Sequence, residues 1–145
     1  MPDVLMIRQR PPHLSVVALL EAEGLPASDL TETHLEHFFF TGSDGAPSAL
    51  VGLEIYGEAA LLRSLVVSVA ARTQGLGSVL LLHAEEYAAA HQVRALYLLT
   101  TTAEPYFAHR GYRRIDRSEA PPSIQSTREF AGLCPSSSAF MIKRL

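Results

Sequence analysis

The stretch Leu61–Ser78, LLRSLVVSVAARTQGLGS, decides the fold of this chain. Its apolar first half predicts a buried strand, and Gly75 and Gly77 in its second half predict a turn that opens a helix. The first N–H groups of a helix lack intrahelical partners and carry partial positive charge, so such a turn stabilises an anion. Glycines let the backbone approach that anion closely, and Arg72 adds a cation. The stretch therefore predicts a site for a diphosphate.

Two common phosphate-binding motifs do not fit this stretch. A P-loop needs Gly-Lys-Ser or Gly-Lys-Thr, and the chain has no such run. A dinucleotide-binding turn needs a third glycine three residues after Gly77, where Leu80 stands. What remains is the pattern Arg-x-x-Gly-x-Gly over residues 72–77. A strand-to-helix turn without a ligand is its competing interpretation.

This pattern, with Leu65-Val66-Val67 before it, resembles the signature of the GNAT superfamily of acyl-CoA N-acyltransferases. The resemblance implies a mixed α/β fold: a central mixed sheet with splayed strands, helices on both faces, and acetyl-CoA as co-substrate. Many relatives have a proline where this chain has Val69, a departure that changes the turn and keeps its N–H groups. The resemblance assigns the pantetheine arm and the diphosphate to Leu65, Val66, Val67, Arg72, Thr73, Gln74, Gly75, Leu76, Gly77 and Ser78, with Thr101 and Phe107 also on the cofactor.

Length, charge and cysteine content set the general class. The chain of 145 residues fits one domain, residues 1–145, that buries a core without a disulfide or a metal. Cys134 is the only cysteine, which excludes an intrachain disulfide and favours a reduced, cytoplasmic setting. The net charge of −3 and the scattered basic residues argue against nucleic acid as a partner. The most apolar window, Leu76–Ala90, contains charged residues and is too short for a membrane span.

Hydrophobic periodicity predicts mixed strands and helices, with Val93–Thr100 parallel to the strand before the long helix. The expected strands are Val4–Arg10, His37–Thr41, Ala49–Tyr56, Leu61–Val69, Val93–Thr100, a short one through Ile115, and Ala139–Lys143. The expected helices are Leu14–Glu23, Asp29–Glu36, Gly75–His91, Ala103–Arg110, and one opened by Pro121-Pro122. This order resembles the GNAT layout over nearly the whole chain.

The aromatic segment YFAHRGY, residues 106–112, departs from the superfamily at one position. In many members a tyrosine there protonates the departing CoA thiolate, whereas this chain has Phe107. Tyr106 stands one residue earlier and points about 100° away around a helix. Three alternatives follow: Tyr106 is rotated into place as the acid, a water replaces it, or the thiolate leaves unassisted. Simple packing of both aromatic rings is the competing interpretation.

Glu54 and Arg63 are the candidate catalytic and acceptor-binding residues of the strands before the glycine turn. A carboxylate between apolar neighbours, as at Glu54, is a candidate to take the proton of an acceptor amine, and a place on a solvent face is the alternative. Period-two alternation puts Arg63 on one face with Leu61, Leu65 and Val67, near the expected cofactor. Its guanidinium suits an oxyanion, and a salt bridge to Glu54 or Glu58 is the competing explanation.

Three segments, VGLEIYGEAALLRSLVV, LYLLTTTAEPYF and STREFAGLCPSSSAFMIK, resemble the small GNAT branch encoded with arsenic-resistance genes. Cousins of that branch acetylate the amine of glutamate analogues that carry phosphinate or arsinate. The resemblance places Thr100 and Thr102 in the acceptor cleft, with Ser126 and Arg128 completing the pocket. Threonines at this point also cap helices, which is the alternative interpretation.

These observations predict an N-acetyltransferase that moves an acetyl group directly from acetyl-CoA to a small-molecule amine. No metal is expected, because the histidines lack the spacing of a metal pair and Cys134 stands alone. A non-catalytic acyl-CoA sensor, suggested by Phe107, and a protein N-acetyltransferase are the alternatives. Homodimerisation through the terminal strand is common in folds of this kind.

Overall fold

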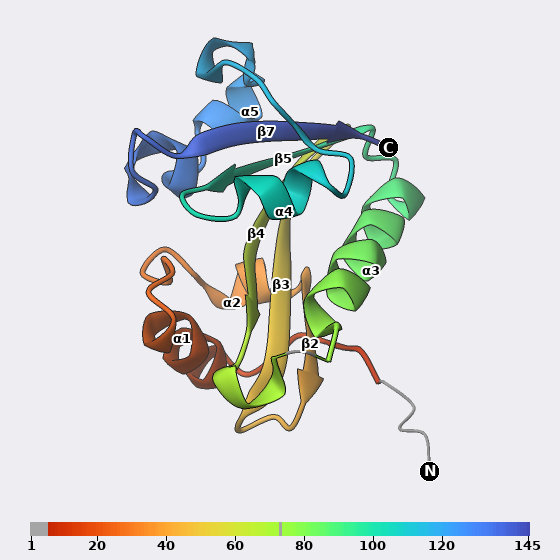
Figure 1. Cartoon of the computed structure of the whole chain (residues 1–145), viewed down its shortest axis with the longest axis vertical. Coiled ribbons are helices and arrows are strands. Elements are labelled where there is room, and N and C mark those ends of the chain that lie inside the picture. Colours follow the sequence, from red (N-terminus) through yellow and green to blue (C-terminus); the bar gives the residue numbers. More distant parts are fainter. Residues whose placement is uncertain (1–5, 73) are drawn as a thin grey trace. The chain divides into compact units, whose positions relative to one another are not determined.

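The computed structural model describes residues 6–72 and 74–145 (Figure 1). Within these residues, seven strands form a mixed sheet in the hydrogen-bonded order β1-β2-β3-β4-β5-β7-β6, which confirms the mixed α/β class. The strands are β1 (Arg8–Gln9), β2 (Phe38–Gly42), β3 (Pro47–Tyr56), β4 (Ala59–Val67), β5 (Ala95–Thr100), β6 (Arg113–Arg114) and β7 (Ala139–Arg144). The helices are α1 (His13–Ala22), α2 (Glu32–Leu35), α3 (Leu76–Ala90), α4 (Glu104–Ala108) and α5 (Pro122–Gln125), with the short helices η1 (Val69–Ala71), η2 (Arg117–Glu119) and η3 (Glu129–Leu133).

The chain divides into two compact units, and the first contains residues up to Leu53 together with Ser64–Ala84. Its core joins α1, α2 and the strands β2 and β3, which lie beside these helices in Figure 1. The buried residues of this core are Val16, Leu20, Ala27, Leu30, Leu35, Phe38, Phe40, Leu50 and Val66. The Thr31 side chain caps α2 by accepting from the His34 backbone N–H. The cap of α2 and this core fix the strands that precede the glycine turn.

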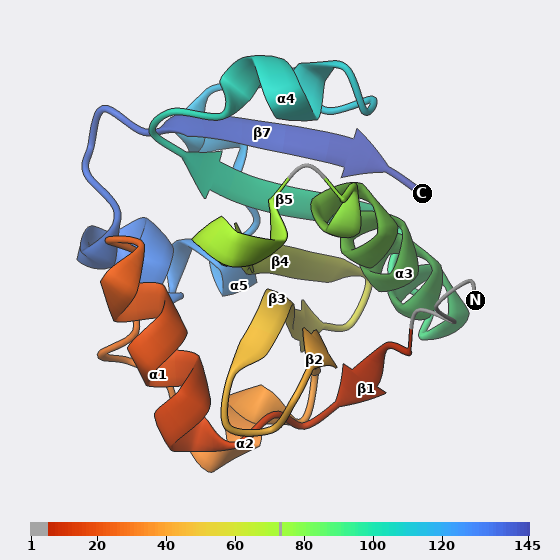
Figure 2. The same ribbon diagram turned by 60° about the horizontal axis from the view of Figure 1, so that its bottom comes forward.

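The second unit contains Glu54–Arg63 and Glu85–Leu145. Here β5 pairs in parallel with the start of β4 and antiparallel with β7, as Figure 2 shows for β5 and β7. The parallel pairing confirms the expectation for Val93–Thr100. Its core is built from Leu61, Ala95, Tyr97, Ile115, Ala120, Ile124, Phe140 and Ile142.

Glu85, on the part of α3 in the second unit, forms a buried polar contact. It accepts a hydrogen bond from the Tyr112 hydroxyl at 2.9 Å, and both its oxygens lie 3.1 Å from Lys143 Nζ. Burial and the adjacent carboxylate raise the pKa of Tyr112 above its usual value. These contacts connect α3 to β7 and to the residue before β6.

Several boundaries differ from the sequence-based expectations, and the predicted helix Asp29–Glu36 is observed as Glu32–Leu35. The predicted strand Val4–Arg10 is observed as Arg8–Gln9, and Val4 and Leu5 lie outside the described residues. β4 ends at Val67, and Val69 instead belongs to η1, where it is 68% exposed. α4 is shorter than predicted, and α5 is followed by the π-helix η3, which periodicity gave no reason to expect. Within the described residues, no helix is long and apolar enough to cross a membrane.

Candidate functional site

The glycine turn lies in the first unit and leads from β4 into α3. After β4, the Ser68 N–H donates to the Ser48 carbonyl at 2.9 Å, which ties the start of the turn to β3. Gly75 has φ +73°, in the left-handed region that favours glycine, and a Cβ there would have no atom within 4 Å. The Gly75 carbonyl accepts from Val79 N at 3.2 Å, so α3 begins immediately after it. Among the described residues, the turn therefore leaves open space at the Cβ position of Gly75.

Arg72 braces this turn. Its Nε donates to the Val67 carbonyl at 3.2 Å, and its Nη2 forms an ion pair with Glu23 at the end of α1. Half of its side chain is exposed. The Arg72 guanidinium thus connects the end of β4 to the end of α1. Because it is engaged there, the main groups available to bind an anion at this turn are the backbone N–H groups at the start of α3.

The other expected cofactor residues of this unit differ in burial. Val66 is 7% exposed and packs in the core, whereas Leu65 and Val67 are half-buried. Gln74 is exposed, Gly77 and Ser78 are half-buried, and Leu76 is buried, whereas Thr73 lies outside the described residues. The core thus anchors the strand through Val66 and leaves its two neighbours partly accessible.

The parallel pairing of β4 with β5 is short. In the second unit it runs from Ala59 against Ala95 to Leu61 against Tyr97. Both strands continue beyond this point, yet within the described residues of this unit the register goes no further. β5 stays paired to β7 as far as Thr100 against Ala139. Among the described residues of this unit, the register of β4 with β5 therefore covers only the first three residues of β4.

A buried hydrogen-bonded network centred on Arg63 lies in the second unit. Arg63 Nη1 lies 2.8 Å from Glu54 Oε2, and Nη2 lies 3.1 Å from Glu129 Oε2. The Tyr56 hydroxyl donates to Glu54 Oε1 at 2.5 Å. The Arg63 side chain is 0% exposed and each carboxylate side chain 5%. The salt bridge between Arg63 and Glu54, left open as an alternative by the sequence, is present, whereas Glu58 instead pairs with Arg94 at the surface.

The alternation expected around Arg63 is interrupted. Ser64 has φ 61°, a left-handed conformation inside β4 that non-glycine residues rarely adopt. A strand keeps strict alternation of faces only while its residues stay extended. Period-two alternation therefore no longer supports a shared face for Arg63, Leu65 and Val67, because Ser64 interrupts the extended backbone between them.

Cys134 joins the network through Glu129. Burial, together with the Glu129 carboxylate and a hydrogen bond to it, raises the pKa of the Cys134 thiol to about 12. A thiol with so high a pKa stays protonated near neutral pH and is a poor nucleophile. Cys134 is thus a protonated donor to Glu129.

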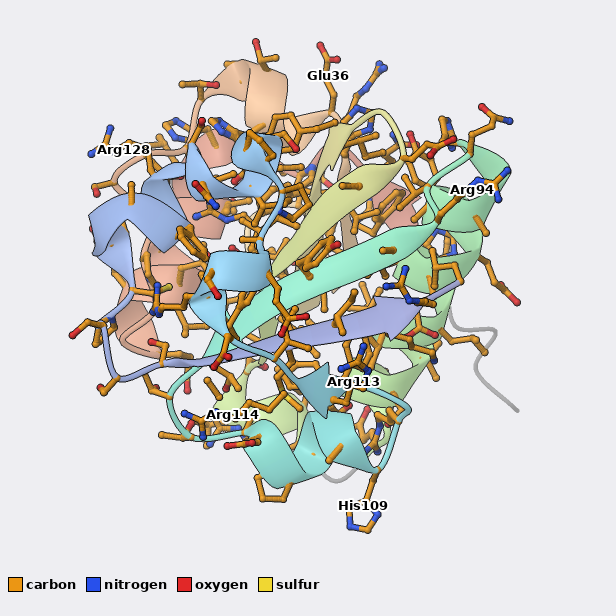
Figure 3. All side chains as sticks on the ribbon, turned by 90° about the horizontal axis from the view of Figure 1, so that it is seen from above. Glu36, Arg94, His109, Arg113, Arg114 and Arg128 are labelled. Atoms are coloured by element: carbon orange, nitrogen blue, oxygen red, sulfur yellow. The ribbon has the colours of Figure 1, made fainter. Side chains whose placement is uncertain are left out.

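The residues assigned to the acceptor cleft have separate positions in the second unit. Thr100 is half-buried, and its hydroxyl accepts from Ala103 N at 3.0 Å, whereas α4 itself begins without a side-chain cap hydrogen bond. Thr101 and Thr102 are exposed. Arg128 is exposed and projects outward from the segment between α5 and η3 (Figure 3). Ser126 Oγ donates to the Pro122 carbonyl at 2.9 Å.

The aromatic pair of α4 is packed edge to face. Phe107 is 7% exposed, and its ring lies 5.2 Å from that of Tyr106 and 5.5 Å from that of Tyr112. The Arg110 guanidinium lies 3.6 Å above the Tyr106 ring. The Phe107 ring thus has a packing role, and the Tyr106 ring makes a cation–π contact with Arg110.

Comparison with known proteins decides the family. A model described as Acetyltransferase (GNAT) family matches residues 7–115, which include the glycine turn and YFAHRGY. The chain belongs to this family. No curated protein sequence matches the chain.

Solved structures share the GNAT fold. N-acetylglutamate synthase from Neisseria gonorrhoeae, complexed with coenzyme A and N-acetyl-glutamate, matches with a TM-score of 0.82 and 24% identity over 100% of this chain and 36% of that chain. A GNAT-family acetyltransferase from Staphylococcus aureus matches with a TM-score of 0.74 and 14% identity over 98% of this chain and 99% of that one. PaiA N-acetyltransferase from Thermoplasma acidophilum, in complex with coenzyme A, has a TM-score of 0.66 and 15% identity, with 99% and 100% covered. This chain spans about a third of the length of the synthase.

Sequence reasoning missed the partners of the buried network. Glu129 and Tyr56 contact Arg63 and Glu54, and neither stands in a motif. For Tyr56 a usable signal existed, because it lies two residues after Glu54 on the same strand. For Glu129 no local signal existed, since a distant segment brings it to Arg63.

Proposed function

We propose that this protein is an N-acetyltransferase that transfers the acetyl group of acetyl-CoA to the amine of a small, amino-acid-like acceptor. The observation that carries the proposal is the open glycine turn at Gly75 within a chain of the GNAT family. The turn supplies helix N–H groups to the cofactor's diphosphate, and Leu65, Val66 and Val67 provide backbone groups for its pantetheine arm. Thr101 and the α4 segment that contains Phe107 complete the cofactor site in this proposal.

Glu54 is the proposed proton acceptor. A protonated amine cannot attack a thioester, so its proton must leave before the C–N bond forms. Glu54 is buried, has both oxygens in defined hydrogen bonds, and comes from a strand rather than a loop. Arg63 orients Glu54 and compensates its charge, a role supported by its two ion pairs. Thr100, Thr102 and Arg128 are the proposed contacts of the acceptor.

The proposed transfer is direct. The neutral amine attacks the thioester carbonyl, and the backbone N–H of Val67 stabilises the resulting oxyanion. Collapse of this intermediate breaks the C–S bond and releases CoA as a thiolate, while the amide nitrogen loses its remaining extra proton to solvent. Phe107 has no acidic proton to donate to the thiolate. The thiolate therefore leaves unassisted, takes a proton from water, or takes one from Tyr106, the other aromatic residue of α4.

The acceptor class is the finer part of the proposal. The resemblance to the small branch encoded with arsenic-resistance genes supports a glutamate analogue that carries arsinate or phosphinate. The fold is also that of a synthase solved with N-acetyl-glutamate, which supports glutamate-like acceptors in general. Both sources point to an amine next to a carboxylate or a tetrahedral oxyanion.

A panel of amines tests the proposal. Purified protein is mixed with acetyl-CoA and with glutamate, other amino acids, phosphinate and arsinate analogues of glutamate, or a lysine peptide, while the free CoA thiol is followed. Thiol release that depends on one small acceptor is the expected result. Release with the lysine peptide alone would instead identify a protein acetyltransferase.

A non-catalytic acyl-CoA sensor is the second candidate, and Phe107 is the observation that favours it. A sensor would bind acetyl-CoA without acceptor-dependent release of thiol. The variant Phe107→Tyr separates the two functions. If the wild type is inactive because it lacks the tyrosine acid, restoring a tyrosine at this position should produce turnover. Turnover that appears only in this variant supports the sensor, whereas an active wild type whose kcat changes less than about twofold in F107Y supports the enzyme.

A further inference from the structure

Glu129 extends the buried pair of Glu54 and Arg63 to a third part of the chain. Two nitrogens of one guanidinium contact the two carboxylates, at 2.8 Å for Glu54 and 3.1 Å for Glu129. All three side chains are at most 5% exposed, so solvent and salt screen these contacts little. Arg63 on β4 thus connects the carboxylate on β3 to the carboxylate that opens η3.

A guanidinium group transmits orientation because it is planar and rigid. When Glu129 holds one Nη atom, the direction of the other Nη atom is fixed as well. Glu54 then meets Arg63 with Oε2 and the Tyr56 hydroxyl with Oε1. Without Glu129, Arg63 could turn and take both oxygens of Glu54, in competition with Tyr56.

The backbone that presents Glu129 is itself held in place. Cys134 N donates to the Glu129 carbonyl at 3.1 Å, and Phe130 N donates to Thr127 Oγ1 at 3.3 Å. The Phe130 ring packs against Phe140 of β7 with centroids 5.2 Å apart. The carboxylate of Glu129 is therefore supplied by an ordered segment.

We infer that Glu129 is a positioning residue for acetyl transfer: through Arg63, it fixes the orientation in which Glu54 takes the proton of the acceptor amine. The inference rests on the proposed function. It gives the C-terminal segment around η3 a part in turnover and none in cofactor binding. It also gives Arg63 the role of a connector between two carboxylates.

Two variants of Glu129 test the inference, with the best acceptor of the amine panel as substrate. Glu129→Gln removes the charge, and Glu129→Asp keeps the charge on a side chain too short for the same contact. Each is expected to lower kcat about tenfold, per folded molecule, with the KM for acetyl-CoA changed less than twofold. Glu86→Gln, the same change at an exposed residue of α3, is the control and keeps the wild-type kcat. A purely structural Glu129 would lower the melting temperature and leave kcat per folded molecule unchanged, which would overturn the inference.

A double-mutant cycle tests the route through Arg63. Arg63→Lys leaves one nitrogen in place of the fork, so the bridge is already lost in this variant. Adding E129Q to R63K should therefore change kcat less than twofold, whereas a further tenfold loss would show that Glu129 acts independently and would overturn the inference. The wild-type assay alone tests the proposed function, since a wild type without acceptor-dependent turnover refutes acetyl transfer before any variant is compared.

Discussion

The glycine turn at residues 72–78 and the buried network around Arg63 are built in opposite ways. The turn consists of neighbouring residues whose conformation follows from Gly75 at φ +73° and from the start of α3. The network joins side chains from β3, β4 and η3, and each of its charges depends on a partner from another segment. A single substitution in the turn therefore has local consequences, whereas one in the network affects every member.

The two regions also differ in what they can contribute chemically. The turn offers backbone N–H groups, which bind a diphosphate and have no proton to exchange near neutral pH. The network offers a buried carboxylate held by a guanidinium and a hydroxyl, which is suited to proton transfer. Cofactor binding and proton transfer should thus be separable by mutation.

The largest expected effect is that of Glu54→Gln. Glutamine keeps the shape but has a single acceptor oxygen, so it can accept from Arg63 or from Tyr56 at the observed positions but not from both, and it cannot take a proton from an amine. We expect kcat to fall at least about 100-fold with the KM for acetyl-CoA unchanged, measured by steady-state release of CoA thiol. Glu58→Gln, at an exposed residue of the same hairpin, should keep full activity. An active E54Q would remove Glu54 from the mechanism and break the comparison.

The next largest effect is that of Gly75→Ala on cofactor binding, which a matched glycine variant separates from the backbone strain that alanine introduces. Gly75 and Gly24 both have φ +73° and both leave open space for a Cβ, so Gly24→Ala is a matched control for Gly75→Ala. Each should lower the free energy of unfolding by about 1 kcal/mol, measured by urea denaturation. Only G75A should raise the KM for acetyl-CoA, by about fivefold, because a methyl group would obstruct the diphosphate. Equal KM values in the two variants would show that the turn has no part in cofactor binding.

Cys134 gives a readout of the network that needs no substrate. With its pKa raised to about 12, the thiol should react with iodoacetamide at pH 8 far more slowly than an exposed cysteine. E129Q removes the carboxylate that raises this pKa, so alkylation should become faster in that variant, as followed by mass spectrometry. Because the folded state holds the proton more tightly than the unfolded state, this group should lower stability as the pH rises from 9.0 toward 12. An unchanged alkylation rate in E129Q would contradict the contact.

The smallest effect concerns Ser138, which is as buried as the side chains around Arg63 but, unlike them, makes no hydrogen bond through its side chain within the described residues. Ser138, next to β7, is 4% exposed, and within the described part of the chain its hydroxyl has no hydrogen-bond partner. Ser138→Ala should raise the free energy of unfolding by about 1 kcal/mol, since it removes an unsatisfied buried polar group. Ser126→Ala, which removes an exposed hydroxyl, should leave stability nearly unchanged. A less stable S138A would show that the hydroxyl has a favourable role.

The sequence predicted the regions that are local in the chain. The glycine turn, the helix after it and the parallel strand beyond were predictable because periodicity and glycine act over a few residues. The alternation argument for Arg63, Leu65 and Val67 does not hold through Ser64, whose left-handed φ no residue-type preference signals. Glu129 was unpredictable for another reason, because only tertiary packing brings η3 to β4.

Some expectations stay predictions. The single domain over residues 1–145, the cytoplasmic setting, the homodimer and the absence of a metal or a nucleic-acid partner are among them. The acceptor contacts of Thr100, Thr102 and Arg128 are also untested, and the hydrogen bond from Ala103 N to the Thr100 hydroxyl supplies a structural reason for that residue.

Calorimetric titration of acetyl-CoA into the wild type, G75A and E54Q tests the division of roles most directly. The account predicts that E54Q binds acetyl-CoA with a Kd within twofold of the wild type and that G75A binds it about fivefold more weakly. It also predicts that kcat falls much more in E54Q than in G75A. Equal weakening of binding in both variants, or weakening in E54Q alone, would contradict the assignment of the cofactor to the glycine turn and of proton transfer to the buried network.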